Sequence, residues 1–467
     1  MTVIPPSALA TRRIATRGVA VRHAVTTLEP GHPLARILAL YLFLLPFSHL
    51  SPAPGVRIRI LQLPNLGGRW EDHLGIGVLL MPEFLFGVGM LVTALLVTGR
   101  WIGRAPLSRG GRVLVTVSVL ALVTALPATV AGDPVGPAVL GWVSVASALS
   151  LGVAVAILRP TEATVRLWVL AFIFGSAAIS AVAIRSYLLA FGVPESLAVL
   201  PANRLHPFYE DYARITYGHS GNTAAVLTVT ASMTLAMLAA PRQSLLLRVV
   251  LALVLAVFIV NLAFAFQRWA WVTLAASLVA VIWRYRRSGT GLTLLVVLSL
   301  VVLQAGAIVA GQLGDYFVEG SSLTAGGSNI GSRIAAWAWA WDLIRLNPAG
   351  YGISLTPTLG LPNVIAHNLL VDAAVEGGVL YAACIGTWAG YVLLRTAGAA
   401  FRLQLTPARF AALLGGAALT TWTVFFGLTV NLGHIILVTL WVVPAAMALG
   451  APETVERPTL AVPPHER

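Results

Sequence analysis

Charged residues and cysteine are both scarce in this sequence, and lysine does not occur at all. Only 10% of the 467 residues are charged and 58% are hydrophobic, whereas an ordinary soluble domain carries roughly a quarter charged residues. The single cysteine, Cys384, cannot form an internal disulfide. Because a soluble core cannot bury this much apolar surface, the composition excludes an ordinary soluble protein and indicates a membrane protein.

The distribution of apolar residues predicts an all-α fold, that of a polytopic integral membrane protein with about 12 transmembrane helices. A membrane-crossing helix needs about 20 mostly apolar residues. The expected helices lie near 34–50, 74–98, 112–131, 138–158, 166–190, 221–240, 246–264, 269–283, 291–311, 368–394, 410–430 and 434–450. A large extracytoplasmic loop is expected at 312–367, between helices 9 and 10, and a second long outer loop at 191–220.

The arginines predict how the chain is oriented in the membrane. With a cytoplasmic N-terminus, 21 of the 30 arginines fall in cytoplasmic tails and loops, which is the bias that membrane proteins show. We therefore expect a cytoplasmic tail at 1–33, which lacks the apolar stretch of a signal peptide. One transmembrane domain at 34–450 and a cytoplasmic tail at 451–467 follow. The net charge of +13 then reflects orientation, and nucleic acid is not expected as a partner.

Nine arginines face outward, where the charge bias does not favour them. We expect some of them to bind a ligand, although for any single one a solvated loop charge explains its presence equally well. They are Arg57, Arg59, Arg69, Arg185, Arg204, Arg214, Arg268, Arg333 and Arg345.

The large outer loop contains a tryptophan-rich segment that predicts a short helix. Ser332 is its expected N-cap, and Pro348 lies just beyond its end. Trp337 and Trp341 are four residues apart and share a helix face. Tryptophan at the boundary between water and lipid is typical of an interfacial helix. A simple membrane anchor explains the tryptophans, but it does not explain Arg333 at the helix start.

Polar residues also gather where the chain re-enters the membrane after this loop. His367 and Asn368 come first, and Asp372 and Glu376 follow on one face of a helix. Acidic residues within a membrane span are costly and usually functional. Near the outer end of a helix they also have a simpler explanation, which is contact with lipid headgroups.

These residues resemble the C-terminal signature of the O-antigen ligase and Wzy-type O-antigen polymerase superfamily of bacterial membrane glycosyltransferases. The resemblance rests on Ser332-Arg333, Trp337, Pro348, Gly350-Tyr-Gly352, His367-Asn368 and Glu376-Gly377-Gly378, together with Arg214 before His219 and with Gln267-Arg268. The sequence departs from the family at Tyr381, where many members have glycine, and at Ser220-Gly-Asn222, where many have a pair such as Asn-Pro.

The resemblance implies glycosyl transfer on the outer face of the bacterial cytoplasmic membrane, in the synthesis of a cell-envelope lipopolysaccharide or exopolysaccharide. The donor would be a glycan on undecaprenyl pyrophosphate. The acceptor would be lipid A core, another carrier-linked glycan or, less often, a protein. Such enzymes are thought to invert the anomeric centre and to need no metal, and no cofactor is expected.

The residue types suit that chemistry. A pyrophosphate leaving group gains charge as the glycosidic bond breaks, and guanidinium groups bind phosphate in a bidentate fork. Arg214, Arg268 and Arg333 are the predicted clamp. His367 is the predicted general base, because imidazole takes a hydroxyl proton near neutral pH.

Several neighbouring residues are predicted to orient the base or to contact the acceptor. They are Asn368, Asp372, Glu376, Trp337 and His219.

Two alternatives remain open at this point. One is a metal-dependent glycosyltransferase that takes sugars from polyprenyl phosphate and uses Glu71 and Asp72 in the first outer loop. That alternative leaves the region of His367 unexplained. The other is a transporter, such as a flippase for lipid-linked glycans. Transporters often show internal repeats and charges at mid-membrane depth, whereas here the polar residues gather at the outer face.

Overall fold

The computed structural model describes residues 27–47, 82–98, 107–133, 135–191, 220–264, 268–286, 296, 299, 329–353, 368–402, 405–425 and 435–450. Most of these residues are helical, and the only β pairing among them is an isolated bridge between Leu28 and Pro160. The helices are α2 (Pro33–Leu44), η2 (Leu45–Phe47), α3 (Pro82–Thr98), α4 (Arg109–Ala131), α5 (Val135–Leu158), α6 (Glu162–Phe191), α8 (Ser220–Ala239), α9 (Leu245–Phe264), α10 (Arg268–Tyr285), α12 (Asn329–Leu346), α13 (Leu369–Gly377), α14 (Val379–Arg402), α15 (Pro407–Phe425) and α16 (Ile435–Leu449).

Five of the described helices contain a segment that is long and apolar enough to cross a membrane. These segments are Arg109–Ala131, Gly141–Leu158, Glu162–Ala181, Leu245–Leu262 and Val379–Phe401. Shorter apolar helices run beside them, so the chain is a polytopic α-helical membrane protein as predicted. The number of twelve spans stays a prediction, because the expected helix at 291–311 lies outside the described residues apart from positions 296 and 299.

The helices form a bundle whose interior and exterior differ in burial rather than in polarity. In the apolar segment of α5, 89% of the residues are buried, because α3, α4 and α16 pack around it. In the apolar segment of α9, 33% of the residues are buried. Leu245 and Leu253 on α9 are 78% and 64% exposed. An apolar helix that leaves leucines exposed is stable only if lipid replaces water around it, so the outer surface of the bundle supports the membrane assignment.

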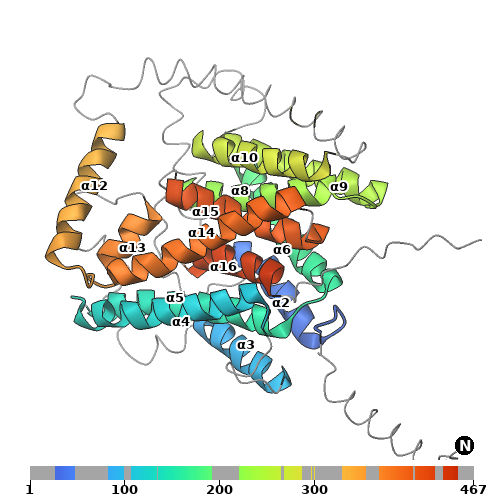
Figure 1. The fold of residues 1–467 in the computed structure, drawn as a ribbon. Coiled ribbons are helices and arrows are strands. Elements are labelled where there is room, and N and C mark those ends of the chain that lie inside the picture. Colours follow the sequence, from blue (N-terminus) through green and yellow to red (C-terminus); the bar gives the residue numbers. More distant parts are fainter. Residues whose placement is uncertain are drawn as a thin grey trace, which may run out of the picture.

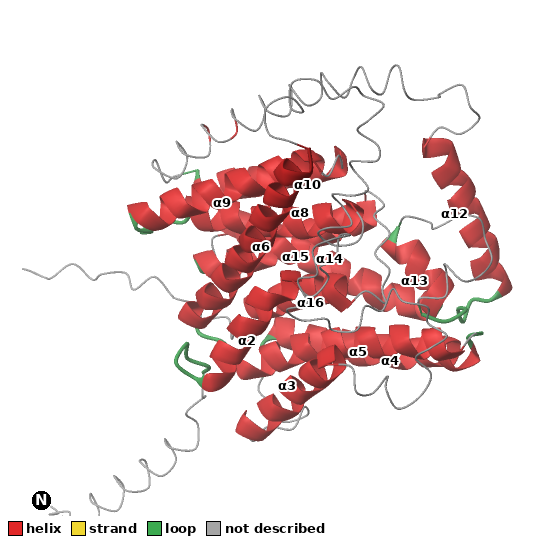
Figure 2. Cartoon of the chain, turned by 180° about the vertical axis from the view of Figure 1, so that it is seen from behind, coloured by secondary structure: helices red, strands yellow, loops and turns green. Residues whose placement is uncertain are grey.

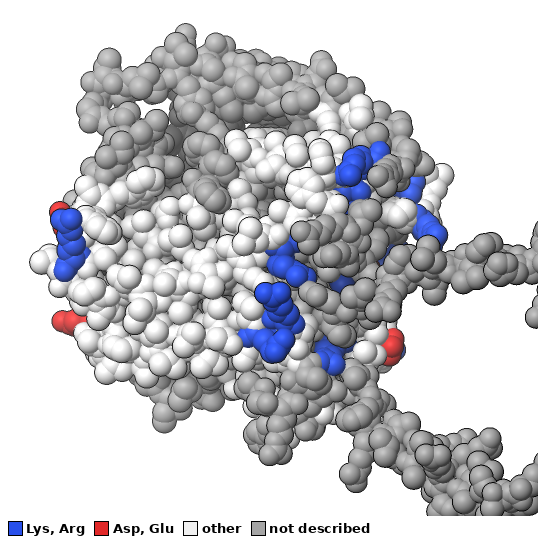
Figure 3. All heavy atoms as spheres, viewed as in Figure 1, with Lys and Arg blue, Asp and Glu red and all other residues white. Residues whose placement is uncertain are grey.

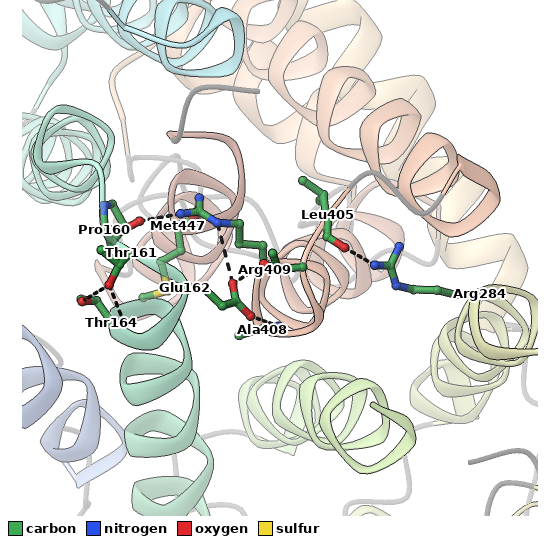
Figure 4. A network of polar contacts seen from close by, with 10 residues as sticks. Pro160, Thr161, Glu162, Thr164, Arg284, Leu405, Ala408, Arg409 and Met447 are labelled. Atoms are coloured by element: carbon green, nitrogen blue, oxygen red, sulfur yellow. Dashed lines mark hydrogen bonds and ion pairs between the residues drawn. The ribbon is translucent and has the colours of Figure 1, made fainter. Parts of the chain in front are cut away.

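Buried arginines join the helices at one end of the bundle. Arg409 of α15 donates to the carbonyl oxygens of Met447 (3.1 Å) and Pro160, and its Nε lies 3.8 Å from Glu162 Oε2 (Figure 4). Glu162 in turn accepts from the backbone N–H of Ala408 at 3.0 Å, at the start of α15. The negative charge of Glu162 lies at the positive end of the α15 dipole, and the positive charge of Arg409 lies near the negative end of the α16 dipole.

Arg284 likewise joins α10 to α14 through hydrogen bonds to carbonyl oxygens. It donates to the carbonyl oxygen of Ala399 at 2.6 Å and to that of Leu405, and it lies over the ring of Phe410. The end of α10 is therefore held beside the end of α14, so these two helices run in the same direction. Most arginines on the face shown in Figure 3 gather toward one side, while an isolated basic group lies at the opposite edge, where Figure 1 places α12.

Helix α12 lies crosswise to the bundle helices, beside α13 (Figures 1 and 2). A crosswise helix at one end of a membrane bundle has the geometry of an interfacial helix. It begins at Asn329, three residues before the expected N-cap Ser332, which therefore lies inside the first turn. The N-cap prediction was wrong, but the helix ends at Leu346, just before Pro348, as expected.

The tenth predicted span is not one helix. The sequence predicted a continuous helix at 368–394, but α13 ends at Gly377 and α14 begins at Val379. The interruption is at Gly378, whose φ of 87° is not helical. The predicted separation of the helices at 246–264 and 269–283 is confirmed, because α9 ends at Phe264 and α10 begins at Arg268.

Candidate active site

Two parts of the sequence signature bind each other through their backbones. The turn after α12 lies against the break between α13 and α14. Tyr351 N–H donates to Val375 O (2.9 Å), Gly352 N–H donates to Glu376 O (2.8 Å), and Val379 N–H donates to Pro348 O (3.0 Å). The first two hydrogen bonds use carbonyl groups that the end of α13 leaves free of helical partners, and the third uses the carbonyl group of Pro348. We call this contact between residues 348–352 and 375–379 the glycine joint.

Glycine is required on both sides of the joint. Gly350 and Gly378 have φ values of 93° and 87°, a region that side chains with a Cβ rarely adopt. A Cβ on Gly350 would lie 2.5 Å from Gly378 N, and a Cβ on Gly378 would lie 2.5 Å from Ala349 O. The close approach of two backbones explains why Gly350 and Gly378 occur together in the sequence.

Asn347 shapes the turn that enters the joint. Its side-chain Nδ2 donates to the carbonyl oxygen of Gly350 at 2.6 Å, and its own N–H donates to Leu343 O at 2.9 Å. The sequence analysis did not single out Asn347. Its position between the last helical residue and Pro348 was the available signal, because asparagine side chains commonly close turns of this kind.

Asn368 fixes the start of α13. Its Oδ1 accepts from Leu370 N–H (3.0 Å) and Val371 N–H (3.3 Å), so it is the N-cap of this helix. Its Nδ2 donates to Val424 O (2.8 Å), near the end of α15. Asn368 was predicted to orient the base or to contact the acceptor, and in the structure it ties α13 to α15. His367 lies outside the described residues, directly before this fixed point.

The two acidic residues of α13 are buried. Asp372 is 4% and Glu376 is 3% exposed, on one face of a helix that packs against α12, α14, α4 and α15. Both carboxyl groups take part in polar or electrostatic interactions. Buried carboxyl groups in an apolar bundle need such partners to offset the loss of water. The alternative explanation from the sequence, contact with lipid headgroups, does not fit their burial.

Helix α12 turns one face to the protein and another away from it. Ala340 packs with Val375 of α13, while Trp337 and Trp341 are 47% and 55% exposed. The guanidinium of Arg345 lies 5.3 Å from the ring centre of Trp341. The two tryptophans share the outward face as predicted, and that face suits either lipid headgroups or a sugar ring.

Three candidate segments come to the same end of the bundle. Because α10 and α14 run in the same direction, their first residues, Arg268 and Val379, both lie at the end opposite Arg284. The start of α13 lies at that end too, since Asn368 contacts the last turn of α15, whose first turn is near Arg284. Helix α12, which carries Arg333, is held there by the glycine joint.

The side chains of the predicted clamp are not all described. For Arg268 and Arg333 the structure describes the backbone, at the first residue of α10 and in the first turns of α12. Arg214, His219 and His367 lie outside the described residues, as do Glu71 and Asp72 of the alternative site. The roles predicted for these side chains therefore stay predictions.

One comparison with known proteins identifies the segment that contains this site. Residues 253–386 match the family model Wzy_C, described as O-antigen ligase. The match runs from within α9 to within α14 and includes Arg268, Arg333, His367 and both sides of the glycine joint. No curated protein and no solved structure matches the chain. The resemblance drawn from the sequence signature is thereby confirmed.

Proposed function

Because residues 253–386 carry a domain of the O-antigen ligase superfamily, we propose that this membrane glycosyltransferase moves a glycan from undecaprenyl pyrophosphate to an acceptor hydroxyl. The reaction takes place at the end of the bundle where α10, α12 and α13 begin, and this end faces the outside of the bacterial cytoplasmic membrane. The acceptor is a second carrier-linked glycan or the lipid A core.

The observation that carries the proposal is the glycine joint. It ties the arginine-bearing helix α12 to α13, and α13 begins immediately after His367. A transfer reaction needs the leaving group and the nucleophile held in one geometry, and such positioning lowers a barrier substantially. At the glycine joint two backbones are in direct contact and hydrogen-bonded, so the joint is suited to fixing the distance between a phosphate clamp and a base.

In the proposed reaction, Arg214, Arg268 and Arg333 bind the pyrophosphate and stabilise the charge that develops on it. His367 removes the proton from the acceptor hydroxyl as that oxygen attacks the anomeric carbon from the face opposite the pyrophosphate. The bond to the pyrophosphate oxygen then breaks and the anomeric centre is inverted. Guanidinium groups supply the positive charge that a metal ion would otherwise provide, so the proposed reaction needs no metal.

In this proposal, the carboxyl groups of Asp372 and Glu376 stabilise the positive charge that develops on His367. They lie one and two turns into α13, on a single buried face. A carboxylate near an imidazole stabilises the imidazolium that forms during proton transfer. Trp337 on the exposed face of α12 is assigned to the sugar or to the headgroup region.

The first experiment uses purified protein in lipid vesicles with carrier-linked oligosaccharide as the sole substrate. Product length is followed by mass spectrometry for the wild type and for His367→Ala. The matched control is His32→Asn, because His32 caps α2 through its Nδ1 and asparagine keeps that capping ability.

Lengthening by the wild type and by H32N, but not by H367A, identifies a polymerase that uses His367. If the wild type does not lengthen the glycan, lipid A core is added to the same vesicles, and transfer to it identifies a ligase. Absence of both products, with carrier-linked glycan crossing the bilayer instead, would overturn the proposed transfer in favour of transport.

A further inference from the structure

A groove of about 760 Å³ runs along the outside of the bundle between α4 and α14, from Arg109 to Leu380, which directly follows the glycine joint. Its walls come from residues 109–124 of α4 and residues 380–387 of α14. Leu120 and Leu380 in these walls are 48% and 69% exposed. The groove therefore opens on the surface that we assign to lipid, and its volume lies within the range of ligand sites, roughly 300–1,000 Å³.

The groove is apolar along its length even though threonines line it. The hydroxyl of Thr124 donates to Leu120 O (2.7 Å), and that of Thr387 donates to Ala383 O (2.7 Å), within their own helices. The hydroxyl donors of Thr124 and Thr387 are satisfied, so these two threonines do not require a polar ligand. Cys384, also in the wall, behaves as a small apolar residue. A hydrocarbon chain suits this part of the groove.

Charge is confined to one end of the groove. Arg109 and Arg112, in the first turn of α4, are both exposed, and the described lining contains no acidic side chain. The first turn of a helix also presents the positive end of its dipole. The start of α4 is anchored, since Ser108 donates to Leu449 O and accepts from Gly111 N–H at 2.9 Å. An anion at this end meets two guanidinium groups on a fixed helix.

The length of the groove matches one leaflet of a bilayer. From Arg112 to Thr124 α4 rises about 18 Å, at 1.5 Å per residue. The hydrocarbon core of a bilayer is about 30 Å thick, so one leaflet contributes about 15 Å. A lipid whose phosphate lies at the arginines would extend an acyl chain as far as Thr124.

We infer that this groove binds an anionic phospholipid of the surrounding membrane. Its phosphate lies between Arg109 and Arg112, and one acyl chain lies along the apolar wall as far as Thr124. Basic pockets between transmembrane helices recognise anionic headgroups in this way. The predicted orientation places these arginines at the cytoplasmic leaflet. The polyprenyl carrier fits less well, because its phosphates belong at the opposite end of the bundle in the proposed reaction.

The test uses two photoreactive lipids that differ only in the headgroup. Phosphatidylglycerol and phosphatidylcholine, each with a diazirine in the acyl chain, are incorporated at equal low mole fraction into phosphatidylcholine nanodiscs that contain the full-length protein. After irradiation, labelled peptides are quantified by mass spectrometry over residues 113–124 and 380–387. Two juxtamembrane arginines should favour the anionic probe by roughly 30-fold, with equal labelling elsewhere on the bundle.

Variants locate the preference. Arg109→Gln with Arg112→Gln should remove it, whereas the control Arg242→Gln with Arg286→Gln should keep it, because both control arginines are exposed and neither lines the groove. Ala383→Phe places a ring in the groove, keeps both arginines and should also abolish the excess. Melting temperatures of the variants show whether each one is folded.

Three outcomes would overturn the inference. Equal labelling of the groove by both probes would show unselective contact with bulk lipid. An excess that survives in the double glutamine variant would assign the charge preference to other residues. Displacement of the anionic probe by undecaprenyl phosphate at lower concentration than by unlabelled phosphatidylglycerol would make the carrier the occupant. None of these measurements depends on glycosyl transfer.

Discussion

The two ends of the helix bundle are held together by different groups. At one end, buried guanidinium groups of Arg284 and Arg409 reach across to carbonyl oxygens of neighbouring segments (Figure 4). At the other end, the glycine joint binds backbone directly to backbone. Arginine is thus a structural residue at the first end, whereas the arginines at the second end are predicted to bind substrate.

This difference shows how one residue type serves two purposes in a chain without lysine. The guanidinium groups of Arg284 and Arg409 are buried where they donate to carbonyl oxygens, so a phosphate in solution or at the membrane surface does not reach them. At the second end the joint is formed by backbone groups, so it uses no arginine side chain. The following predictions test that division, from the largest expected effect to the smallest.

The largest effect is expected from the arginines of the proposed clamp. Arg268→Ala and Arg333→Ala should each lower the transfer rate by about 10²–10³-fold, the usual cost of one lost donor to a developing anion, while the protein still inserts into membranes. The control is Arg345→Ala, because Arg345 lies over Trp341 on the exposed face of α12. Wild-type rates in both clamp variants would contradict the pyrophosphate clamp.

The next effect is expected at the joint itself. Gly378→Ala introduces a Cβ 2.5 Å from Ala349 O at a positive φ, so α12 and α13 should separate slightly. A misplacement of about 1 Å costs up to about 100-fold in rate. Transfer rate and hydrogen exchange at residues 350–352 measure the result.

Gly390→Ala is the control for the joint, since Gly390 lies in α14 and nothing surrounds its Cβ position within 4 Å. Its transfer rate and its exchange at residues 350–352 should equal those of the wild type. A G378A protein with unchanged rate and exchange would show that the joint does not set the geometry of the site.

A stability effect without a catalytic one is expected at the arginine end. Arg409→Met removes the hydrogen bonds to Met447 O and Pro160 O and the contact with Glu162. Hydrogen bonds that involve a charged group contribute about 1.5–3 kcal/mol each at most, so the melting temperature should fall by several degrees. The transfer rate per folded molecule should stay within about twofold of wild type, because a substitution usually has little effect on a distant site that shares no contacts with it.

Arg286→Met provides the comparison for Arg409, since its guanidinium is exposed and lies over Trp283. It should leave the melting temperature almost unchanged, as exposed charge contacts contribute little. A loss of activity in folded R409M would show that contacts at the arginine end also affect the transfer reaction at the other end.

The smallest effect is expected from chelation of divalent metals. Activity should persist, because the proposed clamp supplies the positive charge itself. Transfer rates are measured before and after chelation in the same vesicles. Loss that added metal restores would instead favour the alternative site at Glu71 and Asp72.

The sequence was sufficient to predict the membrane class, the tryptophan-bearing helix after the ninth expected span and the segment that matches the family model. Apolar length, the outward face of Trp337 and Trp341, and the residues from Arg333 to Gly378 are all local signals. Composition and spacing reveal such features because a bilayer demands them of each segment separately. The same local view predicted one helix at 368–394 and missed the break.

That break depended on contacts between segments distant in sequence. The φ of Gly378 is stable because Pro348 and Ala349 lie against it, and Asn368 is fixed because Val424 accepts its hydrogen bond. Nothing local distinguishes a glycine within an apolar helix from a glycine that ends one. The sequence by itself determined which segments enter the membrane, since hydrophobicity is a property of each segment. Only the tertiary structure decided which backbone groups pair between segments, because hydrogen bonds need two partners in fixed geometry.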